Sequence, residues 1–288
     1  MTPYKEYDNA DVFLKDTDLK NTYESLKKNI CMRVFNKDNL PFGKNRTEIP
    51  YFKWADLAIT FAVEKKMYIG DNLGRGYYML GNDFLEENGI SREELRKTAE
   101  SNMNFKNGPR IESITKHLTR SHVLHPVISM PKEAGVKLNV RPETYELHSL
   151  FQAQQYGEIP VLPDSIRSLL GQAGPEKESE QDNENVLIVS NRTMSFASVN
   201  MFIGNTIADV YNRFNEDFYI IPLSVHECMC VKESHALRDA NTVKEAEEDL
   251  NDMLEQINDK LITDEQDILS YSIYKYFHDE GMTMIINS

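Results

Sequence analysis

Two apolar runs rich in β-forming residues constrain the fold most strongly, and they lie at residues 186–190 and 218–231. Branched aliphatic residues dominate the first run and recur in the second together with Phe and Tyr, which is typical of strands buried in a sheet. Between them, Thr206–Phe214 spaces its apolar residues as a helix does. This arrangement predicts an α+β fold with a mixed or antiparallel sheet and packed helices.

Local signals place the other elements. Ser91-Arg-Glu-Glu94 and Thr242-Val-Lys-Glu245 are capping boxes, in which a hydroxyl accepts from a backbone amide and a glutamate reaches back to the cap. Apolar spacing predicts helices at 19–35, 82–88, from 91 onward, 110–119, 163–170 and 242–260. Further strands are predicted at 57–63, 77–80, 197–202, 271–277 and 282–286, the last two as a closing hairpin.

An acidic, low-complexity stretch at residues 171–185 divides the chain. Its only apolar side chain is Ala173, so it buries too little surface to repay the entropy of ordering. The sequence therefore predicts two α+β lobes, at residues 19–170 and 186–288, joined by a flexible acidic loop at 171–185. Residues 1–18 are polar and are expected to form a flexible N-terminus.

The charge balance bears on possible partners. The 288 residues include 32 Lys and Arg against 46 Asp and Glu, a formal net charge of −14. Such a protein repels phosphate backbones, so direct nucleic-acid binding is disfavoured. No apolar run approaches the ~20 residues that span a bilayer, and no secretory signal is present. With three cysteines and no disulfide scaffold, we expect a cytoplasmic protein without membrane contact.

The nearest approach to a chemical constellation is His226, Cys228 and Cys230. On a regular strand these three side chains would share one face, and zinc takes such ligands. No second pair of ligands follows, and strand cores commonly hold small buried cysteines, so metal binding is the weaker alternative. A cysteine nucleophile would need an electropositive, partly exposed setting. We therefore expect neither a metal nor a cofactor.

A catalytic or ligand-binding alternative depends on four polar residues, Asn191, Ser224, His226 and Glu227. Neighbouring strand residues face opposite sides, so His226 and Glu227 cannot form one acid–base pair on a regular strand. A buried, hydrogen-bonded His226 is the competing interpretation. Pro222, which lacks an amide donor, indicates a bulge or a sheet edge where a partner could dock at residues 222–227.

Two other features match no known site. The histidines among residues 117–148 have no metal-ligand spacing; they are His117, His122, His125 and His148. The glycine-rich segment 70–76 leads into a strand, whereas a phosphate-binding loop leads into a helix. We interpret this segment as a turn.

The chain resembles an uncharacterised bacterial domain family, a domain of unknown function seen mainly in gut Firmicutes and often near mobile elements. Two blocks carry the resemblance, residues 30–102 and 186–286. Their most specific segments are Ile49–Phe61, Asn88–Leu95, Ser190–Asn191, Ala197–Ser198, Phe218–Pro222 and Ser224–Glu227. The chain departs from the family pattern at Leu223, Cys228 and Cys230. The resemblance implies an α+β fold and a cytoplasmic bacterial or phage origin, and it implies no reaction.

These observations leave three functional hypotheses. The first is a non-enzymatic accessory protein that binds another protein, in a bacterium or a mobile element. The second is a small-ligand-binding protein or enzyme with a pocket centred on His226 and Glu227. The third is an acidic mimic of nucleic acid, which would require carboxylates clustered on one face.

Overall fold

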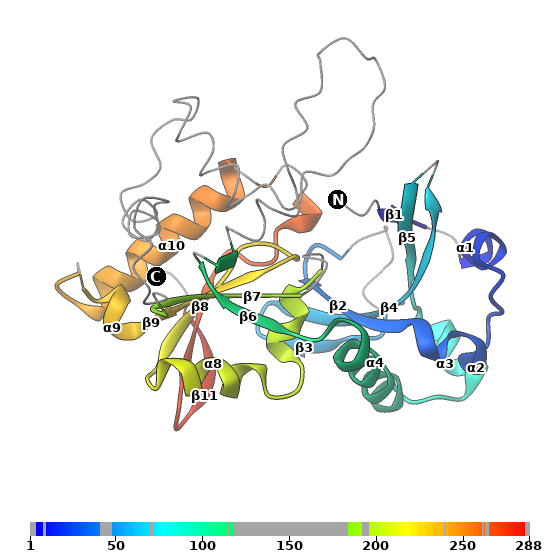
Figure 1. Ribbon diagram of the computed structural model, residues 1–288, viewed down its shortest axis with the longest axis horizontal. Helices are drawn as coiled ribbons and strands as arrows, with labels where there is room; N and C mark the ends of the chain where they lie inside the picture. The colour runs from blue at the N-terminus through cyan, green and yellow to red at the C-terminus, as the bar shows by residue number, and fades with distance from the viewer. Residues whose placement is uncertain are drawn as a thin grey trace, which may run out of the picture.

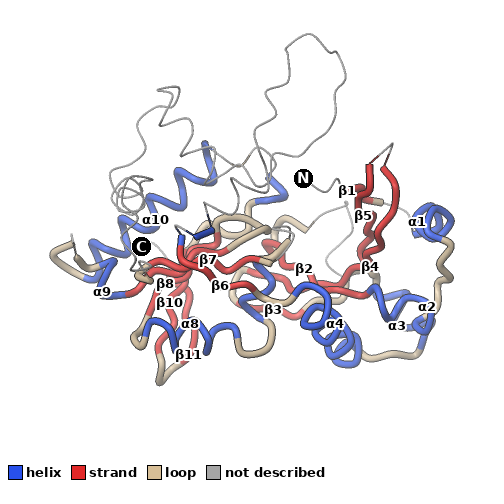
Figure 2. The backbone as a smooth tube through the Cα atoms, viewed as in Figure 1, coloured by secondary structure: helices blue, strands red, loops and turns tan. Residues whose placement is uncertain are grey.

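The computed structural model describes residues 4–7, 10–40, 48–69, 72–114, 116–117, 184–191, 196–238, 240–260, 262 and 265–285. These residues form two sheets with flanking helices (Figure 1), which confirms the predicted α+β class. Figure 2 shows the strands gathered in the middle and most helices at the periphery. Among the described residues, no helix has both the length and the apolar character needed to cross a membrane.

Sheet A consists of β1 (Tyr4–Glu6), β5 (Asn72–Met79), β4 (Leu57–Ile69) and β2 (Ile30–Asn36) in that order, with β3 (Phe52–Trp54) beside β4. Neighbouring strands are antiparallel except β1, which runs parallel to β5. The β4–β5 hairpin confirms the predicted pairing and is longer than expected, because Gly76 lies within β5 rather than in a turn. A Cβ atom at Gly76 would come within 2.9 Å of the Tyr7 ring, so the close approach requires glycine.

Sheet B consists of β11 (Gly281–Ile285), β10 (Ile273–Phe277), β8 (Phe218–Pro222), β9 (Cys228–Lys232), β7 (Val186–Ser190) and β6 (Arg110–Ser113) in that order. Every neighbouring pair is antiparallel. The predicted strand at 186–190 and the closing hairpin are confirmed. Hydrophobic clusters lie on both faces of this sheet, which explains why its central strands are apolar at almost every position.

Within the described residues, the α-helices are α1 (Ala10–Thr17), α2 (Tyr23–Leu26), α3 (Asn82–Asn88), α4 (Arg92–Asn107), α8 (Thr206–Phe214), α9 (Glu233–Ala236) and α10 (Val243–Lys260). The same residues form the 3-10 helices η1 (Lys27–Asn29), η2 (Ser198–Phe202) and η3 (Glu265–Asp267). Both capping boxes place the predicted helix starts, since Ser91 Oγ accepts from Glu94 N–H and Thr242 Oγ1 accepts from Glu245 N–H, each at 3.1 Å. α4 packs against β2, and α10 packs against β8 and β10.

Two predicted elements are wrong, and a third is correct only in part. Residues 19–35 form only short helical turns and then β2, and residues 198–202 form η2. In the helix predicted at 110–119, residues 110–113 form β6, whereas residues 114 and 116–117 are helical. β2 is buried on both faces, so its apolar residues satisfied a helical spacing without forming a helix. The predicted helix at 163–170 lies outside the described residues.

Pro222 does not mark an edge strand. β8 pairs with β9 on one side and with β10 on the other. β10 pairs only with Phe218–Ile220, so the missing amide of Pro222 falls at the strand end, where no second ladder needs it. Residues 222–227 are all buried, and the expected docking edge is therefore not present there.

The halves of the chain share structure across the expected division. β6 precedes the acidic stretch and pairs with β7, which follows it. One hydrophobic cluster includes Phe61 of sheet A and Ile220 of sheet B. At the N-terminus, where flexibility was expected, α1 buries Phe13 completely and β1 pairs with β5. Residues 171–183 of the predicted acidic loop lie outside the described part of the chain.

Candidate functional site

The connection between β8 and β9, residues 223–227, holds most of the polar residues that the sequence singled out. It is a buried bend rather than part of a strand, so His226 does not share a strand face with Cys228 and Cys230 as predicted. Ser224 organises the bend, because its hydroxyl accepts from the His226 N–H at 3.1 Å. Its carbonyl accepts from the Ser198 hydroxyl at 2.5 Å. The backbone of this connection is thus fixed from several sides.

His226 is 1% exposed and faces the N-terminal end of η2. Its Nδ1 accepts the backbone N–H of Phe196 at 2.9 Å, so the neutral ring carries its proton on Nε2. That Nε2 lies 3.8 Å from an Asp267 carboxylate oxygen. Phe196 has φ of 47°, a left-handed conformation that a bulky residue rarely adopts. His226 therefore holds a strained backbone in place.

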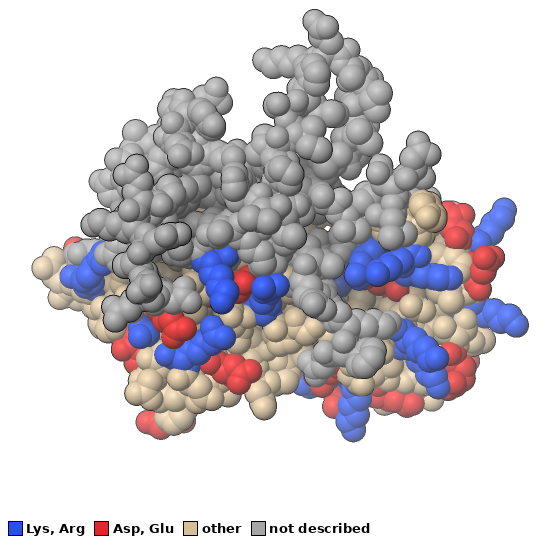
Figure 3. All heavy atoms as spheres, viewed as in Figure 1, with Lys and Arg blue, Asp and Glu red and all other residues tan. Residues whose placement is uncertain are grey.

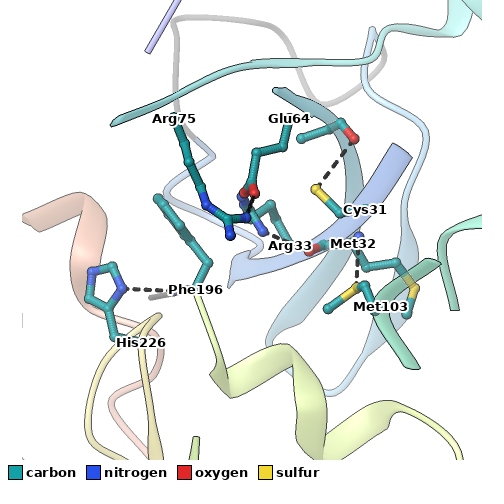
Figure 4. A network of polar contacts seen from close by, with 9 residues as sticks. Cys31, Met32, Arg33, Glu64, Arg75, Met103, Phe196 and His226 are labelled. Atoms are coloured by element: carbon teal, nitrogen blue, oxygen red, sulfur yellow. Dashed lines mark hydrogen bonds and ion pairs between the residues drawn. The ribbon is translucent and has the colours of Figure 1, made fainter. Parts of the chain in front are cut away.

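The Phe196 ring also packs against a buried arginine. Arg33 of β2 is 4% exposed, and its guanidinium carbon lies 4.3 Å from the centre of the Phe196 ring and 5.5 Å from that of Tyr77. Its charge is balanced by Glu64 of β4, which accepts from both Arg33 and Arg75 (Figure 4). Burial alone would raise the pKa of Glu64, but the two guanidinium groups lower it below its usual range.

Glu227 faces a different set of partners. Its carboxylate lies 2.9 Å from His117 Nε2, and His117 Nδ1 lies 3.4 Å from Glu112. The other Glu112 oxygen lies 2.9 Å from Arg110 Nε. Arg110, Glu112, His117 and Glu227 thus form a chain in which basic groups and carboxylates alternate, here called the β6 network. All but Arg110 are buried. Both ring nitrogens of His117 face carboxylates, an arrangement that suits a doubly protonated imidazolium.

The structure thus separates the predicted site residues. His226 faces Phe196 and Asp267, whereas Glu227 faces His117. Ser224 stabilises the bend that joins them, and Asn191 is buried directly after β7. His117 is in the β6 network, while the other singled-out histidines, His122, His125 and His148, lie outside the described residues.

Sequence reasoning missed Arg33, Glu64 and Phe196. Arg33 is the one charged residue within the apolar run 30–35, and a lone charge in such a run is a signal that a buried counter-charge exists elsewhere. Its partner cannot be read from the sequence, because the pairing of β2 with β4 decides which carboxylate comes near. Phe196 has no sequence signal, since its backbone conformation results from tertiary contacts.

Both cysteines of β9 are buried in a hydrophobic environment. Burial raises the pKa of the Cys228 thiol to about 12 and that of Cys230 well above its usual value. Neither thiol is therefore a ready thiolate at neutral pH. In the described part of the chain, no group of three or more His, Cys, Asp and Glu residues is arranged to hold a metal ion.

We predict that Cys228 and Cys230 of the folded protein do not react with a thiol reagent at pH 8, while partly exposed Cys31 reacts slowly. Mass spectrometry after brief alkylation measures this directly, and alkylation in urea gives the total. Fast labelling of Cys228 in the folded protein would contradict the buried environment.

Comparison with known proteins gives one finding. A family model described as "Family of unknown function (DUF5688)" matches residues 4–278. No curated protein and no solved structure matches the chain. The resemblance to an uncharacterised family is thereby confirmed, and the match includes every described strand except β11.

Proposed function

Because the chain belongs to the DUF5688 family, which has no known function, we propose a role from its own surface: it is a non-enzymatic accessory protein that binds an acidic segment of another protein. We place this role in the cytoplasm of a bacterium or in association with a mobile element. The contact element is the outer part of the β4–β5 hairpin, residues 64–69 and 72–76, here called the ribbon. The single observation that supports it most is the exposed Lys66, which lies opposite the half-buried Arg75 and beside the exposed Tyr68.

The ribbon extends beyond the rest of sheet A. β2 pairs with β4 only as far as Val63, whereas β5 follows β4 to Ile69 (Figure 1). β1 flanks β5 only at residues 75–77. Among the described residues, no strand pairs with β4 beyond Val63 on the β2 side. Such an edge can accept an additional strand from a partner.

The side chains of the ribbon suit an anionic partner. Lys66 lies directly opposite Arg75 on the same face, a position in which like charges repel each other. Arg75 already contacts Glu64, whereas Lys66 is exposed and makes no ion pair within the described part of the chain. Tyr68, two positions along the same face, is 75% exposed, which is unusual for a residue of its size. Aromatic residues of this kind commonly anchor protein interfaces.

The other two hypotheses have less support. His226 and Glu227 are buried and face different partners, so a pocket centred on both would require rearrangement. On the face shown in Figure 3, Lys and Arg side chains mingle with Asp and Glu, which does not favour an acidic mimic. Both hypotheses stay predictions.

A photo-crosslinking residue in place of Tyr68 tests the proposal in lysate of the source organism. We expect one protein to be crosslinked stoichiometrically, with the attachment site in an acidic segment. Lys66→Glu in the same chain should reduce the yield at least about tenfold, because it replaces attraction by repulsion.

The matched control carries the crosslinker at Tyr271, which is 67% exposed, together with Lys244→Glu. It should capture no such partner. A crosslinked product that nuclease degrades would show that the partner is a nucleic acid and would overturn the proposal. Equal capture from both positions would also overturn it.

A further inference from the structure

A cavity of about 360 Å³ lies beside β6, at the outer edge of sheet B. Charged and hydroxyl side chains line most of it, namely Arg110, Glu112, Ser113, Lys116, Glu184 and Arg213. We propose that this cavity binds a small phosphorylated molecule, with the phosphate held by the three cations. The proposal is independent of the partner-binding role of the ribbon.

Two of the cations are uncommitted. Within the described part of the chain, neither Lys116 Nζ nor the Arg213 guanidinium makes a hydrogen bond or an ion pair. They come from separate segments, Lys116 from just after β6 and Arg213 from the last turn of α8. On the face drawn in Figure 3, basic side chains near β6 and α8 are interspersed with acidic ones. Two carboxylates also line the cavity, but Glu112 already contacts Arg110 and His117, so the described lining keeps more positive than negative charge and favours an anion.

The third cation, Arg110, is oriented in advance. Its Nε contacts buried Glu112 at 2.9 Å, and Glu112 is itself held by His117. The terminal guanidinium nitrogens of Arg110 remain available, because the contact with Glu112 uses only Nε. A charged side chain fixed by buried partners loses little entropy when it binds a ligand. The β6 network thus fixes the orientation of Arg110 at the cavity.

The composition of the lining indicates the ligand class. Three cations around one cavity match a phosphate group, which carries about two negative charges and several acceptor oxygens, better than a single carboxylate. Ile111 is the one apolar residue among the lining residues described, so an aromatic base has little to pack against. Glu184 and Ser113 can instead accept hydrogen bonds from hydroxyl groups. A phosphate ester of a small polyhydroxylated molecule fits these features, and the volume is at the small end for ligand sites.

Isothermal titration calorimetry with the full-length protein tests the proposal, with inorganic phosphate and glycerol 3-phosphate as probes at constant ionic strength. We expect saturable binding of both. Glycerol 3-phosphate should bind about tenfold more tightly, since its hydroxyl groups add hydrogen bonds worth that factor. Lys116→Ala with Arg213→Ala should weaken phosphate binding at least about a hundredfold.

The matched control replaces two cations that are not among the lining residues, Arg96→Ala with Lys244→Ala, and should bind as the wild type does. Sulfate at the same concentration distinguishes a phosphate site from a general salt effect. Heats that do not saturate, or equal binding by the cavity variant and the control, would overturn the proposal. Binding of phosphate without any gain for glycerol 3-phosphate would overturn the assigned ligand class.

Discussion

Replacing Glu64 with glutamine is expected to lower the free energy of unfolding by about 3 kcal/mol, the lower end of the range for breaking a buried ion pair. Arg33 is almost completely buried, and Glu64 supplies the negative charge beside it. Glutamine keeps the shape and one acceptor oxygen but removes that charge. The remaining pair of guanidinium groups, Arg33 and Arg75, would then lie close together without their shared counter-charge. Urea denaturation at pH 7 measures the loss.

The same variant carries a prediction about pH. The pKa of Glu64 is lowered in the folded state, so its stabilising contribution is complete above the unfolded pKa of about 4.3 and is lost as the pH falls through the lower folded value. The wild type should therefore lose stability in acid more steeply than Glu64→Gln. The difference between the two proteins should be largest at pH 7 and should shrink below about pH 4.

Glu100→Gln is the matched control, because Glu100 pairs with Arg96 on the surface of α4 and a surface pair contributes little, about 0.5 kcal/mol. If Glu64→Gln is no less stable than Glu100→Gln, Arg33 does not depend on this carboxylate. A difference that stays constant from pH 7 to about pH 3 would contradict the lowered pKa.

Signals confined to neighbouring residues gave correct predictions. The two capping boxes placed the starts of α4 and α10, since a cap depends only on residues within one turn. The hairpins of β4–β5 and β10–β11 were also recognised, because turn residues separate their apolar runs. Local chemistry decides these elements, and tertiary contacts only reinforce them.

Elements decided by burial were less predictable. The apolar run of β2 is compatible with a helix and with a strand buried on both faces. Its pairing with β4 and its packing against α4 make it a strand. At β6, pairing with β7 overrode a helical pattern. In β2, periodicity cannot distinguish a helix from a strand, because apolar residues lie on both faces.

The candidate site was predicted in part. His226 and Glu227 were recognised as residues with possible chemistry, and they face different partners although they lie in a bend and not on the expected strand. Their partners could not be predicted, because Phe196 and His117 are 30 and 110 residues away in the sequence. The structure brings them together through η2 and through the pairing of β6 with β7. Long-range pairing of this kind leaves no trace in a single sequence.

His117→Leu is expected to destabilise the protein by about 3–5 kcal/mol, because the change leaves two carboxylates buried without the group between them. Glu227 loses a partner at 2.9 Å and Glu112 loses one at 3.4 Å, although Glu112 keeps Arg110. Leucine has a similar size, so lost packing contributes little. Urea denaturation of the variant and of the wild type gives the difference.

A second substitution separates the charge effect from a packing effect. Glu227→Gln in the His117→Leu background should restore at least about 1 kcal/mol, because it neutralises the carboxylate that lost its partner. In the wild-type background Glu227→Gln should instead destabilise, since it removes an acceptor charge from His117. His278→Leu, at an exposed histidine, should cost less than about 1 kcal/mol. Additive effects of the two substitutions at 117 and 227 would show that no charge coupling stabilises the β6 network, because a coupled pair must deviate from additivity.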